Sequence, residues 1–575
     1  MRQHPRGERR MTQICVPIMV EEHASAIRDA TLAAEHGADL VEFRIDVFFE
    51  DKEESTDLLQ DRIDRVLDLV KGSPLPCIVT CRPHWEGGEY HGDDDERVSL
   101  YEALGTSDHP PAYIDVELAT YTRSANIRQK INLGVNHPKQ QRAVSTRLIL
   151  STHDFEGRPS DLTRKLLQMQ DEPACSVIKI AYRARSIRDN LELFEILRDQ
   201  TKPTIALGMG DFGIMSRILA PKFGGFLTFA SLRDESTTAP GQITIEDLLG
   251  LYRFRSIKPS TKVYGIIGWP VKQSMSPLVH NAGFEQIGWD GVYVPMPVES
   301  SYESFKATVL SLIDHEDLDF MGASVTIPHK EHLVRLAAES PLRFMIKIFG
   351  ESDRHAEAAL HGAANTFFHD GYAWSHEGKS GWQSEGQYLY NTDITAILQL
   401  IPELFSELEH RQIVIIGAGG VARAAAAAAL EHGSLVRITN RSHERAQQLQ
   451  SELMTGREST WEGLIEVLDT DQLSTSRADL YINCTPVGMT GGPDPDGLSI
   501  PIPDMPNLSP DTVFFDTVYN PIETPMLKAA KERGYRTIDG AAMFVKQAAA
   551  QFEIWTGQAA PEDLFDTLVR EKLSE

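Results

Sequence analysis

Short apolar runs alternate with helical patterns from the start of the chain to about residue 254. Stretches such as 24–36, 58–70 and 190–198 repeat apolar residues with the spacing of amphipathic helices. Eight βα units in about 250 residues predict a (β/α)₈ barrel, with a doubly wound open sheet as the alternative. The predicted strands span residues 14–20, 40–44, 77–81, 112–116, 147–151, 177–181, 204–208 and 226–230.

A polar joint at 256–262 ends this pattern, and a different α/β pattern follows it. A strand at 263–267 leads into the segment 268–281, in which Ser274 and Ser276 lie just before a predicted helix. A second strand begins at Ser324 and passes into a helix at Pro328. These elements predict a separate α/β domain with its own binding site.

A strand, a glycine-rich turn and a helix occur in order further along the chain. The apolar strand 413–416 is followed by a turn containing Gly417, Ala418, Gly419 and Gly420, and then by an alanine-rich helix at 421–430. Glycines permit a tight turn and close backbone approach, and a helix N-terminus binds pyrophosphate. Because both flanking elements are present, we expect a Rossmann dinucleotide-binding domain.

The next strand, 435–439, ends without the acidic residue that would favour NAD. Arg441 and Arg445 suit a 2′-phosphate instead, and each charge-assisted contact contributes about 1.5–3 kcal/mol. We therefore predict NADP(H) as the cofactor, with Asn440 and Ser442 in the same loop and Gly540 also contributing to its site.

The predicted fold is α/β throughout, with a barrel, a substrate domain and a Rossmann domain in that order. The expected bounds are a disordered tail at 1–11, the barrel at 12–255, a linker at 256–262, a substrate domain at 263–396, and a Rossmann domain at 397–540, with terminal helices at 541–575 that return to cover the substrate domain.

Charge and cysteine content narrow the class of protein. The chain has 56 lysines and arginines against 83 aspartates and glutamates, a formal net charge of −27, which disfavours non-specific binding to nucleic acid or an anionic membrane. The longest apolar run, 424–430, is far below the roughly 20 residues of a membrane span. The basic segment 1–10 lacks the apolar segment of a secretory signal. Five scattered cysteines fit a reducing cytosol, so we expect a cytoplasmic protein. We expect no metal, because no second Cys or His pair completes a zinc set with Cys77 and Cys81.

Unusual polar residues follow the predicted barrel strands, where such barrels place their chemistry. Each of them alone could be a structural ion pair or a hydrogen-bonded loop residue. They are Glu42, Arg44 and Asp46 at strand two, Arg82 and Glu86 after strand three, Asp115 and Glu117 at strand four, His153 after strand five, Arg217 after strand seven, and the Thr-Ala-Pro-Gly-Gln loop from Thr238 to Gln242 after strand eight.

Lys179 is the residue that a structural role explains least well. It lies within strand six, between apolar neighbours. One face of a barrel strand points inward and the other packs on helices, so the ammonium is largely desolvated on either face. Desolvation disfavours the ammonium, and a neutral amine in a barrel mouth is a nucleophile for carbonyls. The sequence thus predicts a Schiff-base lysine.

Together these elements resemble type I 3-dehydroquinate dehydratase across nearly all of residues 12–254. The resemblance implies that Lys179 forms an iminium with a substrate ketone and that His153 acts as general base and then general acid, oriented by Glu86. It implies that substrate is held by Glu42, Arg44, Arg82, Arg217, Thr238 and Gln242. Thr238 replaces the serine that is usual in the family, and the hydroxyl is kept.

The second half resembles shikimate dehydrogenase across residues 262–575. The resemblance implies that Lys330 and Asp393 form the catalytic pair. It implies that the substrate is bound by Ser274, Ser276, Thr326, Asn365, Tyr519 and Gln547. Taken singly, the two serines could equally be helix caps. Leu389, Ile394 and Ala396 stand where family members usually have glycine, and the segments 340–361 and 372–387 look longer than usual.

Both resemblances imply a bifunctional enzyme that dehydrates 3-dehydroquinate to 3-dehydroshikimate and reduces it to shikimate with NADPH, as a monomer or homodimer. One alternative is a catabolic fusion that oxidises quinate or shikimate with NAD. A second is a non-catalytic, ligand-sensing regulator with the same fold. A third is the tail of a longer multienzyme polypeptide.

Overall fold

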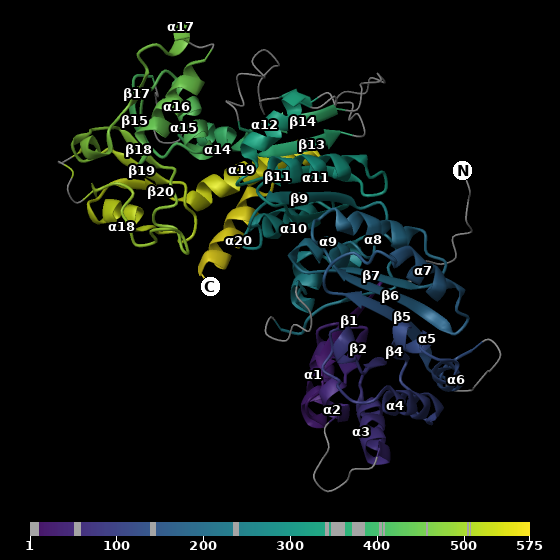
Figure 1. Cartoon of the computed structure of the whole chain (residues 1–575). Coiled ribbons are helices and arrows are strands. Elements are labelled where there is room, and N and C mark those ends of the chain that lie inside the picture. Colours follow the sequence, from purple (N-terminus) through teal and green to yellow (C-terminus); the bar gives the residue numbers. More distant parts are fainter. Residues whose placement is uncertain are drawn as a thin grey trace. The chain divides into compact units, whose positions relative to one another are not determined.

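The computed structural model describes residues 11–50, 59–137, 145–233, 241–339, 344–346, 363–370, 386–401, 405, 409–455, 458–502, 505 and 508–574. The chain divides into two compact units (Figure 1). The first comprises Met1–Thr261 with Val294–Val298 and Asp314–Asp319, and the second comprises the remainder. The division after Thr261 falls within the predicted linker, while the finer domain bounds stay predictions.

An eight-stranded parallel sheet forms the first unit, in the order β7-β6-β5-β4-β3-β2-β1-β8. The amide of Phe226 donates to the Thr204 carbonyl at 2.8 Å, which brings the chain entering β8 against β7. The predicted barrel is therefore confirmed, and each of the eight predicted strands is present. The strands are β1 (Gln13–Met19), β2 (Leu40–Arg44), β3 (Cys77–Thr80), β4 (Tyr113–Glu117), β5 (Arg147–Asp154), β6 (Cys175–Arg183), β7 (Thr204–Met209) and β8 (Leu227–Phe229).

Helices follow the strands and lie outside them (Figure 1). The three predicted helices correspond to α1, α3 and α8. The α-helices are α1 (His23–Glu35), α2 (Asp46–Glu50), α3 (Leu59–Gly72), α4 (Asp94–Thr106), α5 (Leu118–Thr122), α6 (Ala125–Gly134), α7 (Leu162–Asp171), α8 (Asp189–Arg198) and α9 (Ile214–Ile218). Short 3₁₀ turns occur at His84–Glu86, Asp211–Gly213 and Phe254–Ser256, and a π-helical turn at Asp247–Leu251.

Strand alternation divides the barrel interior into layers. An apolar layer fills the end where the strands begin, with Leu40, Ile78, Tyr113, Ile149 and Val177 among its buried members. Inward-facing residues recur every second position along a strand. The next layer therefore consists of Glu42, Thr80, Asp115, Ser151 and Lys179, all buried, and the following one includes Arg44, Arg82, Glu117 and His153. The barrel interior is therefore apolar where the strands begin and polar toward their carboxyl ends.

The first sheet of the second unit is mixed, in the order β10-β9-β11-β13-β14-β12. All of this sheet except part of β10 belongs to that unit. Strands β9 and β11 are parallel, whereas β13 runs antiparallel to both β11 and β14. The bounds are β9 (Lys262–Gly268), β10 (Gly291–Pro297), β11 (Phe320–Val325), β12 (Phe344–Ile346), β13 (Thr366–Asp370) and β14 (Gly386–Tyr390), with helices α10 (Ser276–Gln286), α11 (Tyr302–Asp314) and α12 (Lys330–Glu339).

The second sheet of this unit is fully parallel, in the order β17-β16-β15-β18-β19-β20. This is the strand order of a Rossmann domain, as predicted. The strands are β15 (Gln412–Ile416), β16 (Leu435–Thr439), β17 (Ile465–Val467), β18 (Leu480–Asn483), β19 (Val513–Asp516) and β20 (Arg536–Ile538). The helices are α14 (Thr392–Leu400), α15 (Gly420–Glu431), α16 (His443–Met454), α17 (Glu458–Trp461) and α18 (Pro525–Glu532), with a 3₁₀ turn at Thr470–Thr475.

Two helices that follow the Rossmann domain in the sequence complete the substrate domain. Helix α19 (Gly540–Thr556) packs on α14, β11 and β13, and α20 (Glu562–Ser574) packs on α10 and α19. Figure 1 shows α19, in yellow, beside β11, in teal. Among the described helices, none is long and apolar enough to cross a membrane.

Candidate active sites

Lys179 lies on β6 inside the barrel and is 5% exposed. Its Nζ donates to Asp115 Oδ2 at 2.8 Å and to Glu42 Oε1 at 3.1 Å, and it lies 4.7 Å from the centre of the Phe229 ring. The amine is desolvated, as predicted. The prediction did not include the two carboxylates that compensate its charge. The environment of this amine therefore combines burial with two ion pairs.

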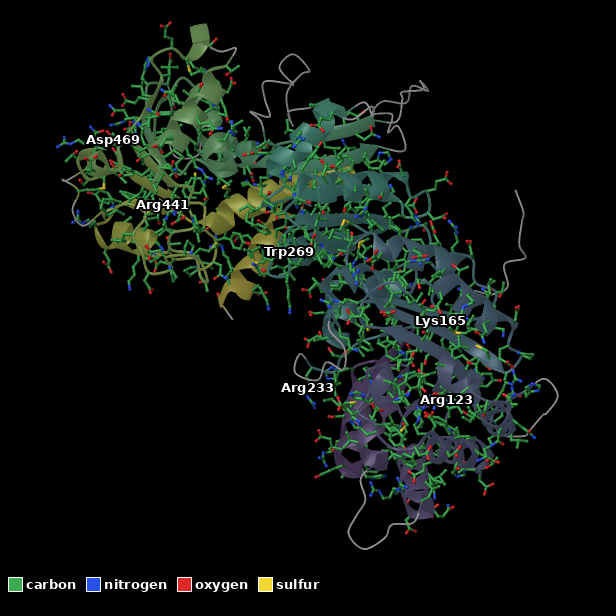
Figure 2. The ribbon with its side chains drawn as sticks, in the orientation of Figure 1. Arg123, Lys165, Arg233, Trp269, Arg441 and Asp469 are labelled. Atoms are coloured by element: carbon green, nitrogen blue, oxygen red, sulfur yellow. The ribbon has the colours of Figure 1, made fainter. Side chains whose placement is uncertain are left out.

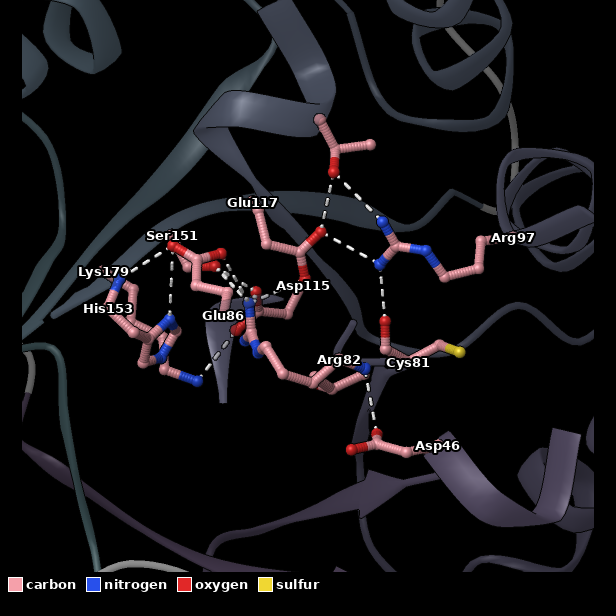
Figure 3. A network of polar contacts seen from close by, with 12 residues as sticks. Asp46, Cys81, Arg82, Glu86, Arg97, Asp115, Glu117, Ser151, His153 and Lys179 are labelled. Atoms are coloured by element: carbon pink, nitrogen blue, oxygen red, sulfur yellow. Dashed lines mark hydrogen bonds and ion pairs between the residues drawn. The ribbon is translucent and has the colours of Figure 1, made fainter. Parts of the chain in front are cut away.

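A buried polar network surrounds this lysine (Figure 3). Arg82 bridges two carboxylates of β4, with Nη2 2.9 Å from Asp115 Oδ1 and Nη1 2.8 Å from Glu117 Oε1. Ser151 Oγ donates to Asp115 Oδ1 at 2.6 Å and accepts from Arg82 Nη1 at 2.9 Å. Burial alone would raise the pKa of Asp115, but Arg82 and Lys179 lower it well below its usual range. Asp115 is thus an anion fixed against Lys179.

His153 lies in the same mouth, on β5 next to β6. Its backbone amide donates to Glu86 Oε1 at 2.9 Å, while its Nδ1 is buried without a hydrogen-bond partner, 3.9 Å from the same oxygen. Burial, and then the charges of Arg82 and Lys179, lower the pKa of His153 well below its usual range. Burial also raises the pKa of Glu86 to about 8. At neutral pH the imidazole is therefore a free base, and Glu86 holds the backbone of His153 rather than its ring.

The other predicted barrel residues differ in their surroundings. Arg44 is half-buried and pairs with Asp46, with Nη2 2.6 Å from Oδ2. Arg217 lies in the last turn of α9, is 3% exposed, and has an Nε without a hydrogen-bond partner. Gln242 is half-buried and precedes the π-helical turn by five residues. Thr238 lies outside the described residues.

The second unit contains a cavity of about 170 Å³ lined by residues of β9, β11, α14 and α19. Its lining brings together residues up to 285 positions apart in the sequence, from Ile266 to Gln551. All of the substrate-binding and catalytic residues predicted for this half lie there, namely Ser274, Ser276, Thr326, Lys330, Asn365, Asp393, Tyr519 and Gln547. The geometry therefore assembles one site from separate motifs.

Lys330 and Asp393 form an ion pair in the lining of this cavity. Lys330 is the first residue of α12, and its Nζ lies 2.5 Å from Asp393 Oδ2. Asn365 Nδ2 donates to Asp393 Oδ1 at 2.9 Å and to Gln547 Oε1 at 3.3 Å. The lysine is thereby aimed at the cavity by a carboxylate that is itself held.

The residues that replace the usual glycines near Asp393 are packed into the core. Leu389 and Ala396 are fully buried, and Ile394 is buried. Asn391 caps α14 by accepting from the Ile394 amide, so the turn forms with these side chains in place. Most of the long segments 340–361 and 372–387 lies outside the described residues.

Sequence reasoning missed two polar residues in the floor of the cavity, Ser324 and Gln551. Ser324 Oγ accepts from the Tyr293 hydroxyl and donates to Gln551 Oε1, both at 2.7 Å. Ser324 begins the predicted strand but was not assigned a role in the site, and Gln551 carries no motif of its own. The signal was the position of Gln551, four residues and one helical turn beyond Gln547.

The glycine turn before α15 has the geometry of a dinucleotide cradle. Gly417 has φ +117°, and a Cβ there would lie 2.9 Å from the Cys484 carbonyl oxygen. A Cβ on Gly419, which precedes the helix, would meet nothing within 4 Å, so the approach to the helix N-terminus is open. A Cβ on Gly420 would lie 3.5 Å from Lys330 Cδ. The cradle therefore opens next to Lys330.

The loop after β16 presents two arginines to solvent. Arg441, labelled in Figure 2, and Arg445 are both exposed. Ser442 caps α16, and Asn440 Nδ2 donates to the Ser442 carbonyl at 2.9 Å, so side-chain contacts fix this loop. Gly540 begins α19, where a Cβ would lie 2.4 Å from the Val518 backbone. Among the described side chains, no group of three or more His, Cys, Asp or Glu is placed to hold a metal.

Four family models match the chain in the order of its domains. They are Type I 3-dehydroquinase at residues 14–259, Shikimate dehydrogenase substrate binding domain at 266–341, Shikimate / quinate 5-dehydrogenase at 399–485, and Shikimate 5′-dehydrogenase C-terminal domain at 540–570.

Similar proteins cover one or both halves. The chloroplastic bifunctional 3-dehydroquinate dehydratase/shikimate dehydrogenase of Arabidopsis thaliana is 36% identical over 572 residues, covering 96% of this chain and 83% of that protein. The shikimate dehydrogenase (NADP(+)) of Methanocella arvoryzae is 32% identical over 54% of this chain and 99% of its own length. A solved structure of dehydroquinate dehydratase and shikimate dehydrogenase from S. pombe is 24% identical, covers 97% of this chain and 98% of that one, and has a TM-score of 0.41.

Proposed function

Because this chain belongs to the family of bifunctional 3-dehydroquinate dehydratase/shikimate dehydrogenases, we propose that it carries out both reactions in sequence. The barrel dehydrates 3-dehydroquinate to 3-dehydroshikimate, and the second unit reduces that product to shikimate with NADPH. The observation that carries this proposal is a buried, carboxylate-paired Lys179 in one unit and the Lys330–Asp393 pair in the other.

In the barrel, the Lys179 ammonium gives up a proton and the resulting amine adds to the substrate ketone. The ketone oxygen then leaves as water, taking up one proton, which gives an iminium. The iminium withdraws electrons from the adjacent carbon, so His153, a free base at neutral pH, removes a proton from it. The electron pair forms the new double bond as the hydroxyl departs, protonated by the same imidazole. Hydrolysis of the iminium then releases product and restores Lys179.

Arg217 is the best candidate to bind the substrate carboxylate. Its guanidinium is buried, and no ion pair joins it to another described residue. A planar guanidinium can bind a carboxylate through two parallel hydrogen bonds. Binding of the substrate anion supplies the charge that the buried cation lacks.

In the second unit, Lys330 gives a proton to the oxygen of the carbonyl that is reduced, and Asp393 holds the lysine in position. NADPH, when bound, supplies the hydride. Ser274 and Ser276, at the start of α10, bind the substrate carboxylate near the helix N-terminus. Asn365 and Gln547 present amide groups to the ring hydroxyls.

Arg441 and Arg445 support NADP over NAD, because both are exposed beside the end of β16, where the adenosine ribose of a Rossmann ligand lies. The open helix N-terminus at Gly419 supports pyrophosphate binding. A cytoplasmic location, and a monomeric or homodimeric state, remain predictions.

The test is to incubate the full chain with 3-dehydroquinate and NADPH and to identify the product. We expect shikimate with consumption of NADPH. In a parallel reaction, borohydride plus 3-dehydroquinate should add ligand mass to the peptide containing Lys179, and Lys179→Met should not be labelled. Full dehydratase activity with Lys179 unmodified would rule out the Schiff-base mechanism.

A further inference from the structure

Seven charged side chains alternate in sign from the barrel centre to helix α4, each paired with the next (Figure 3 shows most of them). In order they are Glu42, Lys179, Asp115, Arg82, Glu117, Arg97 and Asp94, with pair distances of 3.1, 2.8, 2.9, 2.8, 2.9 and 2.6 Å. We propose that Arg97 is a positioning residue for the dehydratase, which fixes Glu117 and, through Glu117 and Arg82, the carboxylate that holds Lys179. This inference rests on the proposed dehydratase activity.

Arg97 makes the outer contacts of this charge row. It is fully buried on α4, and its Nη1 donates to Glu117 Oε2 at 2.9 Å and to the Cys81 carbonyl at 2.6 Å. Its Nη2 donates to Asp94 Oδ1 at 2.6 Å and to Thr120 Oγ1 at 3.0 Å. The guanidinium therefore has fixed partners on both sides and cannot turn away from Glu117.

Glu117 transmits this position to the active site because its two oxygens are divided between two arginines. Oε2 accepts from Arg97, and Oε1 accepts from Arg82 Nη1 at 2.8 Å. Arg82 in turn places Nη2 2.9 Å from Asp115 Oδ1, and the other oxygen of Asp115 accepts from Lys179. Each carboxylate thus joins two cations, so a change at one end reaches the other.

Burial makes the row sensitive to the loss of any member. Arg97, Glu117 and Asp115 are fully buried, and Arg82 is 3% exposed. Removal of one partner of a buried pair leaves the other uncompensated, which is far more disruptive than the loss of a surface pair. Without Arg97, Glu117 would attract the Arg82 guanidinium more strongly. The ion pair between Arg82 and Asp115 would then weaken.

Arg97 also ties α4 to the chain after β3, through the Cys81 carbonyl, so a purely structural role must be distinguished from an electrostatic one. The pH dependence of the dehydratase separates the two, because His153 must be uncharged to act as base. The charged and titratable groups that face His153 are Glu86, Arg82, Asp115, Lys179 and Arg44. A change in the charge of the row therefore changes the pH at which His153 is protonated.

The experiment compares kcat/KM for 3-dehydroquinate from acid to neutral pH in the full-length protein. Arg97→Met removes a positive charge and favours the imidazolium, so the acid limb should move to higher pH by roughly 0.5 to 1 unit. We expect kcat to fall by about 10- to 100-fold and KM to change less than threefold. Shikimate dehydrogenase activity of the same samples should be unchanged, which reports protein amount and the folding of the second unit.

Further variants control for side-chain loss. Glu117→Gln removes a negative charge and should move the acid limb to lower pH. The double variant Arg97→Met/Glu117→Gln removes one charge of each sign, so its limb should return toward that of the wild type. Arg97→Lys keeps the charge and should keep the limb in place. Arg164→Met, on the exposed face of α7, is the matched control for the loss of an arginine and should alter neither limb nor rate.

The inference is overturned if the acid limb stays in place in Arg97→Met, or if the double variant behaves no better than the single one. Should Arg97→Met be too unstable to assay, Glu117→Gln decides the matter, since an unmoved limb in that variant contradicts the electrostatic role. A wild-type protein that does not turn over 3-dehydroquinate contradicts the proposed function instead. The two failures are therefore distinguishable.

Discussion

Arg217 illustrates how a single residue can favour ligand binding at the expense of stability. Its guanidinium is 3% exposed, and burial lowers its pKa to about 10. A buried charge without a partner is costly, because desolvation is not offset by an ion pair. In the free enzyme this cost is present, and the proposed binding of the substrate carboxylate would relieve it.

We predict that Arg217→Met weakens substrate binding but stabilises the barrel. KM for 3-dehydroquinate should rise by about 100-fold, equivalent to roughly 2.7 kcal/mol, while the free energy of unfolding increases by about 1 kcal/mol. Steady-state kinetics measure the change in KM. The stability of the barrel is compared between variant and wild type by denaturant unfolding and by hydrogen exchange of α9. Arg164→Met serves as control, and a barrel destabilised by Arg217→Met would show that the guanidinium is already compensated.

The residues that sequence reasoning identified are those that carry motifs. Lys179, His153, Lys330 and Asp393 belong to short patterns, so their roles could be predicted before their positions were known. Arg97 lies in an ordinary-looking helix, and its function depends on Glu117 across the barrel wall. Such contacts cannot be predicted from spacing, because they join elements through packing and not through the sequence.

Helices and strands could be predicted where apolar residues alternated with polar ones, or recurred with helical spacing, without interruption. The eight barrel strands and the turn between β15 and α15 appear where they were expected. The antiparallel strand β13 was not anticipated, since its apolar residues Phe367 and Phe368 suit several pairings. The π-helical turn at Asp247–Leu251 was also missed, because nothing in its composition separates it from an α-helix.

The loop between β16 and α16 should determine cofactor choice. We predict that Arg441→Ala/Arg445→Ala raises KM for NADPH by about 100-fold and leaves KM for NADH within about threefold, because only NADPH carries the 2′-phosphate. Initial rates of shikimate oxidation or dehydroshikimate reduction with each cofactor are the measurement. Arg411→Ala, at the opposite end of β15, is the control. Equal losses with both cofactors would argue against 2′-phosphate recognition.

At the scale of the whole molecule, each unit has its own core and its own lysine-centred site. Lys330→Ala should therefore lower reduction by at least about 1,000-fold and leave dehydration within about twofold. Lys179→Ala should have the reciprocal effect. Separate assays with 3-dehydroquinate and with shikimate plus NADP measure the two activities. Parallel loss of both in either variant would contradict the independence of the sites.

The late position of α19 in the sequence has a consequence for biosynthesis. The barrel is built from consecutive βα units and can form while the polypeptide is still being translated. Gln547 cannot join the sheet around β11 until the ribosome has translated 177 further residues after β13 (547 − 370), which takes roughly 9 to 35 s at ordinary elongation rates. A nascent chain would thus hold a working dehydratase before its reductase is assembled.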